Sequence, residues 1–445
     1  MTQALSTEPI TTLGPGHKGL APSAWGMSQE EFVDSRPRLG DQQTPLLTLD
    51  KAALEHNVAE MFAWAEGAGL TLAPHAKTTM APVLWAALLE AGAWGVTVAT
   101  GWQAQVARSF GITHVMVANA LADPVAVRWA ADEMNRDPTC EILSWVDDSR
   151  TISAMEKVLR QAGAERKMPV IVELGAMHGR TGVRGVRRAI ELARQVHDSR
   201  LLELAGVGGY EGVLAHDRSA VSLARVDAYL DDIATLHRSV SQCDLLRDAS
   251  PIVTAGGSAY FDRVAARLGP LSDAAIVLLR SGAFQLHDDG FYAGISPMGR
   301  LPGTRPLRSA MHVRTRVLSH PEPHLALLDA GKRDLPFDEG LPVPLFVVGV
   351  SEDESRRLLA GARVSALNDQ HAFLQLPGGL ADDLPPGTVV VLGLSHPCTA
   401  MDRWRLIPIV ERAAGRAPAG PSAGGTVPAC VYDDTVITAL AETYF

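Results

Sequence analysis

Basic charge, cysteine and long apolar runs are all scarce in this sequence of 445 residues. Lys and Arg together number 40 against 50 Asp and Glu, which leaves a net charge of -10. That balance argues against a nucleic-acid partner, because phosphate backbones bind basic surfaces. No apolar run is long enough to cross a bilayer, so no membrane partner is expected.

The cysteines and the N-terminal segment point to a reduced compartment. The 4 cysteines lie far apart, at positions 140, 243, 398 and 430, and do not form the close spacing of a disulfide framework. The opening segment, "MTQALSTEPITTLGPGHKG", has no basic stretch followed by an apolar one, as a secretory signal would have. Both observations predict a cytoplasmic protein. The length favours one large domain with a smaller one.

From residue 44 onward, short apolar or β-branched runs alternate with segments of helical periodicity. This alternation predicts parallel βαβ units. Eight units favour a TIM-like (β/α)8 barrel over an open sheet, although periodicity alone does not show closure. The predicted strands cover residues 70–76, 94–100, 114–120, 141–148, 169–175, 202–210, 251–257 and 274–282.

After about residue 306 the pattern changes to short alternating runs broken by Gly, Pro and Asp, which is typical of antiparallel β structure. The sequence therefore predicts a barrel over residues 45–305 and a C-terminal antiparallel β domain over residues 306–445. Part of the N-terminal segment, around "TPLLTLD", is expected to join the second domain. The predicted β runs cover residues 311–320, 324–331, 345–353, 362–376 and 387–398.

The first barrel strand runs into "PHAKTTM", which places Lys77 at its carboxyl end. The active sites of βα barrels lie at the carboxyl ends of the strands. Among apolar neighbours the amine of Lys77 would be partly desolvated and available for Schiff-base chemistry. A lysine paired with a barrel carboxylate is the alternative, and position alone does not decide between the two.

A second feature follows a later barrel strand, in "VTAGGSAYFD". Consecutive glycines at positions 256 and 257 let backbone N–H groups approach an anion, and Ser258 adds a hydroxyl. Thr254 precedes them at the end of the strand. The alternative is a tight turn that merely needs glycine. A strand-end lysine and a Gly-Gly-Ser phosphate cup on one barrel together predict a pyridoxal 5'-phosphate site.

A third feature lies in the predicted β domain, in "GLSHPCTAMDRW". His396 and Cys398 are two residues apart, so on an extended strand both side chains would emerge on one face. Imidazole and thiolate are a good ligand pair for zinc. Two protein ligands are fewer than a structural zinc site has, which predicts open positions for water or substrate. A surface histidine beside a buried cysteine is the alternative.

"PHAKTTMAP", "TAGGS" and the late "HPC" together resemble the D-threonine aldolase and D-serine dehydratase-like family, over about residues 44–412. These are fold-type III pyridoxal phosphate enzymes related to alanine racemase. The resemblance implies that Lys77 carries the cofactor as a Schiff base and that Gly256, Gly257 and Ser258 hold its phosphate. It also implies a divalent metal on His396 and Cys398.

The same resemblance adds three residues to the predicted site. His75 lies in the lysine motif and is expected to contact the cofactor. Arg180, in "VELGAMHGRTGV", matches a family arginine that faces the cofactor ring near the pyridine nitrogen. Tyr210, in "GGYEGVLAH", ends another strand, where it would bind substrate or stack near the ring, and it is counted with Lys77 as catalytic.

The predicted function is therefore that of a lyase, dependent on pyridoxal phosphate and a metal, that acts on D-configured 3-hydroxy amino acids. Zinc is the expected metal and manganese the alternative. Cys398 resembles the dehydratase branch, since the aldolases tend to have Asp there; retro-aldol cleavage of the D-threonine aldolase type remains the first alternative. An amino-acid racemase and a non-enzymatic cofactor carrier are further alternatives. A homodimer is expected.

Overall fold

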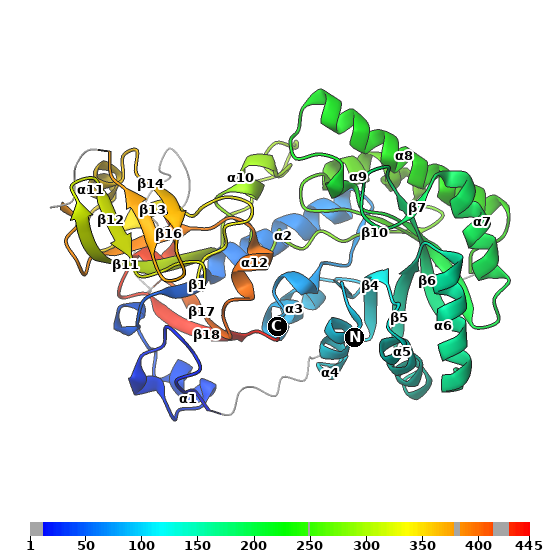
Figure 1. Cartoon of the computed structure of the whole chain (residues 1–445), viewed down its shortest axis with the longest axis horizontal. Helices are drawn as coiled ribbons and strands as arrows, with labels where there is room; N and C mark the ends of the chain where they lie inside the picture. The colour runs from blue at the N-terminus through cyan, green and yellow to red at the C-terminus, as the bar shows by residue number, and fades with distance from the viewer. Residues whose placement is uncertain (1–11, 248–249, 378–382, 413–426) are drawn as a thin grey trace.

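The computed structural model describes residues 12–247, 250–377, 383–412 and 427–445 (Figure 1). The first eleven residues, part of the segment that predicts the absence of a secretory signal, lie outside the described residues. The chain forms a barrel and a β domain that lie side by side, with the β domain on the left in Figure 1. None of the helices in the described ranges has the length and hydropathy needed to cross a membrane.

The predicted eight-stranded parallel barrel is confirmed, in the order β2-β10-β9-β8-β6-β5-β4-β3. Trp94 N donates to Leu72 O at 2.9 Å and Thr97 N donates to Pro74 O at 2.8 Å, so β3 is joined back to the β2 segment and the barrel closes. Seven of the eight predicted ranges contain the whole of the observed strand. The observed strands are β2 (Thr71–Leu72), β3 (Val96–Val98), β4 (His114–Ala120), β5 (Glu141–Val146), β6 (Met168–Gly175), β8 (Leu202–Gly208), β9 (Ile252–Ala255) and β10 (Ile276–Leu279). The one exception is Met168, which begins β6 one residue early.

Helices cover the outside of the barrel strands (Figure 1). Their ends follow from local sequence: Asp148 Oδ1 accepts from Arg150 N at 2.7 Å at the start of α6, and Gly163 ends that helix with a left-handed φ of 69°. The barrel helices are α2 (Lys51–Gly67), α3 (Pro82–Glu90), α4 (Gly101–Ser109), α5 (Pro124–Arg136), α6 (Ser149–Ala162), α7 (Val186–His197), α8 (Ala220–Gln242) and α9 (Phe261–Leu268).

Apolar side chains fill the inside of the barrel as well as the layer between strands and helices. This double burial explains the nearly continuous apolar runs of the sequence, because parallel strands are covered on both faces. The inner cluster consists of Ala73, Met116, Leu143, Trp145, Ile171, Ala205, Ile252 and Leu278. These side chains fill the barrel interior, so a ligand can bind only at the mouth of the barrel, at the carboxyl ends of the strands.

The β domain is built on a second sheet, in the order β14-β15-β12-β11-β1-β17-β18, with β16 pairing β11 and β13. β1 (Leu46–Asp50) pairs antiparallel with β11 and parallel with β17, so "TPLLTLD" joins this sheet as predicted. The other predicted runs overlap strands β11 (Met311–Glu322), β12 (Leu325–Leu328), β13 (Val343–Val347), β14 (Arg363–Leu367), β15 (Ala372–Gln375) and β16 (Val389–Gly393). The run predicted over residues 345–353 is wrong after Val347, because a turn and then a helix follow. Sequence patterns missed β17 (Leu406–Glu411) and β18 (Val436–Glu442).

Short elements complete the described chain. They are α1 (Gln29–Asp34), β7 (Val183–Arg184), α10 (Phe291–Ile295), α11 (Glu352–Leu358) and α12 (Pro397–Met401), with six 3-10 turns, of which η3 (Ala76–Thr78) and η4 (Glu211–Val213) bear on the site. The predicted strand over residues 387–398 is wrong at its end, because Pro397 begins α12.

Candidate active site

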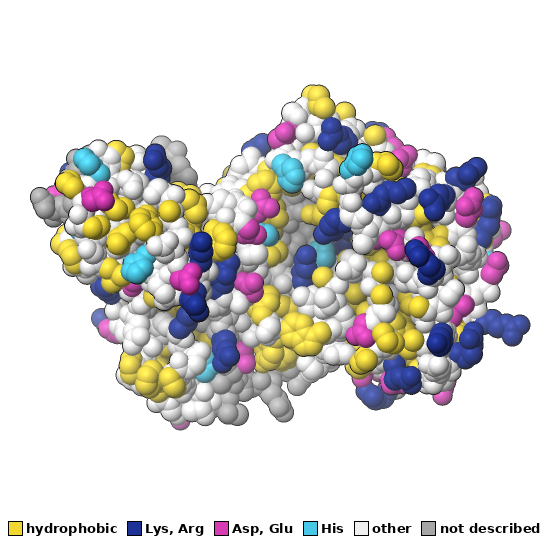
Figure 2. Space-filling model, in the orientation of Figure 1, with side chains coloured by type: hydrophobic (Ala, Val, Ile, Leu, Met, Phe, Trp, Pro, Cys, Tyr) yellow, Lys and Arg dark blue, Asp and Glu magenta, His cyan; other side chains and the backbone are white. Residues whose placement is uncertain are grey.

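A cavity of about 240 Å³ lies at the mouth of the barrel and is lined by residues of both domains. Figure 2 shows this face of the molecule hollowed between the β domain and the barrel. Eight of the ten predicted site residues line the cavity: His75, Lys77, Arg180, Tyr210, Gly257, Ser258, His396 and Cys398. The remaining two, Thr254 and Gly256, are buried outside it.

Lys77 lies in η3, directly after the first barrel strand, as the sequence predicts. The buried Trp85 holds this turn, since its Nε1 donates to Thr79 Oγ1 at 3.0 Å. Lys77 takes part in none of the ion pairs among the described residues. The alternative, a lysine paired with a barrel carboxylate, is therefore wrong. The amine therefore faces the cavity without a competing partner charge bound to it.

Three buried polar atoms of cavity-lining residues have no hydrogen-bond partner, namely His75 Nδ1, Trp145 Nε1 and Arg280 Nε. Burial lowers the pKa of His75 well below its usual value, and the charges of Lys77, Arg280 and Arg180 lower it further. His75 is therefore neutral. Unpaired buried polar groups are rare and costly, so these three atoms indicate a polar ligand at this wall.

The glycine turn differs from the prediction. Gly256 N and Gly257 N donate to the two carboxylate oxygens of the buried Glu211, at 3.0 Å and 2.6 Å. These N–H groups are therefore not free for a phosphate. Ser258 does line the cavity, and its Oγ accepts from Ala283 N at 3.1 Å. Thr254 is structural, since its Oγ1 donates to Leu278 O at 2.9 Å.

Glu211 should be a strong determinant of stability, because its carboxylate satisfies two buried N–H groups and lies near the buried charge of Arg280. In Glu211→Gln the amide nitrogen would face one of these N–H donors. We expect a loss of about 3 kcal/mol in the free energy of unfolding, measured by urea denaturation. The control Glu191→Gln removes only an exposed ion pair with Arg187 and should barely change stability. Equal stability of both variants would contradict the role given to Glu211.

Arg280 is a site residue that the sequence analysis missed. It directly follows β10, is buried, and its guanidinium donates to Thr254 Oγ1 and, at 2.7 Å, to Gly209 O. Burial lowers its pKa to about 10, against the opposing charge of Glu211, so it stays protonated at neutral pH. Its place at a strand end, like that of Lys77, was the available signal.

Arg180 lies over the ring of Tyr210, with its Cζ 4.5 Å from the ring centroid. Burial, together with the charge of Glu211, raises the pKa of Tyr210 to about 12, so Tyr210 is a neutral phenol. Burial raises the pKa of the Glu173 carboxyl to about 7, although Thr181 Oγ1 donates to it at 2.9 Å and the charge of Arg180 lowers it. Arg180 and Tyr210 are therefore brought together at the cavity, and Arg180 acts electrostatically on this buried carboxyl.

His396 and Cys398 do line the cavity, but not from one face of a strand. His396 follows β16 with a left-handed φ of 60°, and Cys398 lies in the first turn of α12. Pro397 locks its own φ and starts the helix, which is why the period-two argument fails. Cys398 Sγ lies 3.3 Å from Thr78 Oγ1, so the pair is in contact with the residue that follows Lys77.

The two side chains have the chemistry of a metal pair. Burial by itself raises the pKa of Cys398, but its interactions with His396 and Thr78 and the charge of Lys77 lower it overall. A thiol that ionises readily is a good ligand for a soft or borderline cation. Within the described ranges no group of three or more His, Cys, Asp and Glu side chains is arranged to hold a metal. A metal here would therefore have two protein ligands and open positions.

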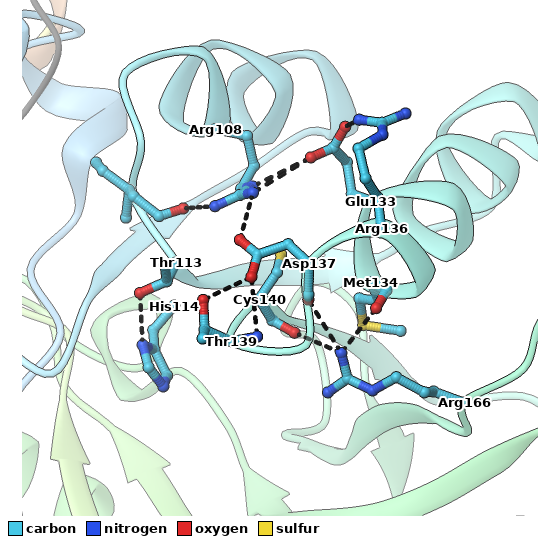
Figure 3. A network of polar contacts seen from close by, with 11 residues as sticks. Arg108, Thr113, His114, Glu133, Met134, Arg136, Asp137, Thr139, Cys140 and Arg166 are labelled. Atoms are coloured by element: carbon cyan, nitrogen blue, oxygen red, sulfur yellow. Dashed lines mark hydrogen bonds and ion pairs between the residues drawn. The ribbon is translucent and has the colours of Figure 1, made fainter.

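A second cavity, of about 510 Å³, opens at the amino ends of β4, β5, β6 and β8. Figure 3 shows the polar network beside it, in which Arg166 Nη1 donates to the carbonyls of Met134, Asp137 and Cys140. Arg108 is bound to Glu133 and Asp137 in the same network. Both arginines bind the end of α5 and the turn that follows it. Because the amino face of a βα barrel contributes to stability rather than catalysis, this cavity is not the candidate active site.

A parallel barrel with a lysine at a strand end, beside a separate β domain, is the architecture of a fold-type III pyridoxal phosphate protein. Family models agree with this class. "Alanine racemase, N-terminal domain" matches residues 49–264, and "Putative serine dehydratase domain" matches residues 310–410. The chain thus combines an alanine racemase-like fold-type III domain with a serine dehydratase-type domain.

Among its relatives are a D-threonine aldolase of an Arthrobacter species, 28% identical over 359 residues (79% of this chain, 85% of the relative), and a 3-hydroxy-D-aspartate aldolase of Paracoccus denitrificans, 28% identical over 341 residues (75% and 82%). A D-threo-3-hydroxyaspartate dehydratase of a Delftia species is 24% identical over 370 residues (80% and 90%).

The solved structures have the same fold. The D-threonine aldolase of Filomicrobium marinum superposes with a TM-score of 0.70 at 25% identity, over 91% of this chain and 97% of that one. A D-threo-3-hydroxyaspartate dehydratase with a cysteine replaced by alanine, in a metal-free form, superposes with a TM-score of 0.67 at 20% identity, over 92% of this chain and 99% of that one.

Proposed function

We propose that this protein is a pyridoxal phosphate-dependent lyase that acts on a D-configured 3-hydroxy amino acid with the help of a divalent metal. The observation that carries the proposal is the meeting of Lys77 with His396 and Cys398 at one cavity, coupled through Thr78. Relatives over three quarters or more of this chain are lyases named for such substrates.

The residues present fit the cofactor. Lys77 would hold it covalently, Ser258 and the neighbouring turn residues Ser281 and Gly282 would face its phosphate, and His75 and Trp145 offer unpartnered polar atoms. Gly282 leaves no room for a side chain, since a Cβ there would lie 2.6 Å from His75 Cβ. When bound, pyridoxal phosphate supplies an electron sink for charge that develops at the substrate Cα.

The two arginines suit different tasks. Arg280 is buried and fixed by Thr254 and Gly209, so it is the better candidate to face the cofactor ring and keep its nitrogen unprotonated. Arg180, which the sequence analysis gave that role, is exposed beside Tyr210 and is then available for the substrate carboxylate. The amine of Lys77 lines the same cavity and would serve as the base for the α proton of the substrate.

His396 and Cys398 would hold the metal, most suitably zinc, because imidazole and thiolate match its preference. A metal with open positions can bind the β-hydroxyl of the substrate and make it a better leaving group. A D-threo-3-hydroxyaspartate dehydratase with a cysteine replaced by alanine is described in a metal-free form, which supports a metal in this group of proteins.

Dehydration is favoured over retro-aldol cleavage on the strength of Cys398, while the aldolases among the relatives support the second reaction. The test is to incubate the purified holoprotein with D-serine, D-threonine and D-threo-3-hydroxyaspartate, with the L-enantiomers as controls. Keto acid with ammonia identifies the dehydratase, and glycine with an aldehyde identifies the aldolase. Racemisation without either product pair would contradict the proposal.

Large apolar side chains near the barrel mouth support a homodimer. Trp102, Val125, Met177 and Val221 follow four different barrel strands, and each is between 49% and 71% exposed. All four follow the carboxyl ends of their strands, so an interface over the barrel mouth would remove this apolar surface from water. We expect twice the chain mass of 47.4 kDa by light scattering, and a dimer weakened by Trp102→Ser. A monomer at all concentrations would contradict this assembly, which we place in the cytoplasm.

A further inference from the structure

His396 is held at two points by acidic side chains from different parts of the chain. Its backbone N–H donates to Asp288 Oδ2 at 3.0 Å, and its ring Nδ1 lies 2.6 Å from Asp338 Oδ2. A non-glycine residue with φ of 60° is in an unfavourable backbone region and persists only where its surroundings fix it. These two contacts supply such surroundings.

Asp338 is itself fixed. Its second carboxylate oxygen, Oδ1, accepts from Thr399 Oγ1 at 2.7 Å, and Thr399 lies in α12 one residue after Cys398. Both oxygens of Asp338 are therefore engaged by the segment that carries the two proposed metal ligands. Rotation of the carboxylate would break one of the two bonds.

This geometry decides which ring nitrogen of His396 remains for a metal. A carboxylate only accepts hydrogen bonds, so Nδ1 must carry the proton and donate it to Asp338. In the neutral imidazole that a metal would bind, the lone pair is then on Nε2, the nitrogen that Asp338 does not contact. Asp338 is not placed as a third ligand, because the described residues contain no three-residue group of metal-binding side chains.

We propose that Asp338 is a positioning residue that orients His396 and fixes its tautomer, so that Nε2 binds the metal together with Cys398. The inference rests on the proposed metal site and goes beyond it by assigning a residue that does not touch the metal. Carboxylate partners of metal-binding histidines raise the basicity of the ligand and hold its ring in place, and their removal typically weakens metal binding by about 10- to 100-fold.

The experiment measures zinc affinity of the full-length holoprotein by competition with a chromophoric chelator. Asp338→Ala should weaken zinc binding by about 10- to 100-fold without lowering the thermal unfolding temperature. Asp338→Asn should bind more tightly than Asp338→Ala, because its amide oxygen can still accept from Nδ1. The matched control is Glu339→Gln, which removes an exposed charge one residue further on and should keep wild-type affinity.

The outcomes separate the two proposals. A wild-type protein that binds no zinc overturns the metal site, and the role of Asp338 with it. A wild-type protein that binds zinc, with unchanged affinity in Asp338→Ala, overturns the role of Asp338 alone. Equal weakening in Glu339→Gln would also overturn it, because the effect would then come from net charge near the site rather than from the bond to His396.

Discussion

Lys77→Ala should fold normally and yet hold no cofactor that borohydride can attach to the protein. The side chain lies in a turn fixed by Trp85, so its removal leaves the turn intact while it deletes the amine at the barrel mouth. Lyase activity should fall by about 1,000-fold or more, because the residue is both the attachment point and the proposed base. Peptide mapping after reduction, together with the absorbance of the bound cofactor, provides the measurement.

An exposed lysine elsewhere provides the control for this experiment. Lys157 lies on the surface of α6, and Lys157→Ala should retain a reducible cofactor and full activity. If Lys77→Ala still gives a reducible, covalently held cofactor, another amine carries it and the assignment of Lys77 is wrong.

Removal of the metal should have the second largest effect, and it should leave the cofactor in place. Because only two protein ligands are available among the described residues, chelators should strip the metal without unfolding the chain. Turnover of 3-hydroxy substrates should fall by at least about 100-fold, which corresponds to the several kcal/mol that a metal contributes to such a reaction. Cys398→Ala should reproduce the loss, and added zinc should restore little activity.

Two variants sharpen this prediction. Cys243→Ala changes an exposed cysteine outside the site and should leave activity and metal content unchanged. Cys398→Asp exchanges a soft sulfur ligand for hard oxygen, which should favour manganese and shift products toward aldol cleavage. Full activity after exhaustive chelation, with no metal found by elemental analysis, would rule out the lyase mechanism and make a racemase the better hypothesis.

The barrel could be predicted from sequence because its strands are buried on both faces and read as apolar runs between helical segments. β17 escaped this pattern because Pro408 interrupts its run, and proline lacks the N–H of a strand interior. β18 was not predicted because no local feature of the sequence shows that this segment pairs with β17, about thirty residues earlier. The sequence thus predicted local pattern well, and long-range pairing less well.

The site followed the same division. Lys77 was predictable from its place at a strand end, and His396 and Cys398 from their ligand chemistry. Glu211 was not, because its importance comes from two N–H groups more than forty residues away that only the fold brings to it. The same contact explains why the glycine turn, correctly located, lacks the free N–H groups that its sequence suggests.

The 3.3 Å contact between Thr78 and Cys398 constrains how this architecture can be recombined. Thr78 belongs to the barrel and Cys398 to a segment 320 residues later, yet the two set the spacing between the amine and the metal pair. A chimaera that takes its barrel from one relative and its β domain from another should work only when both sides of this contact come from the same parent. Domain shuffling among these enzymes would then be expected to exchange the η3 turn and the α12 segment together, as a single inherited unit.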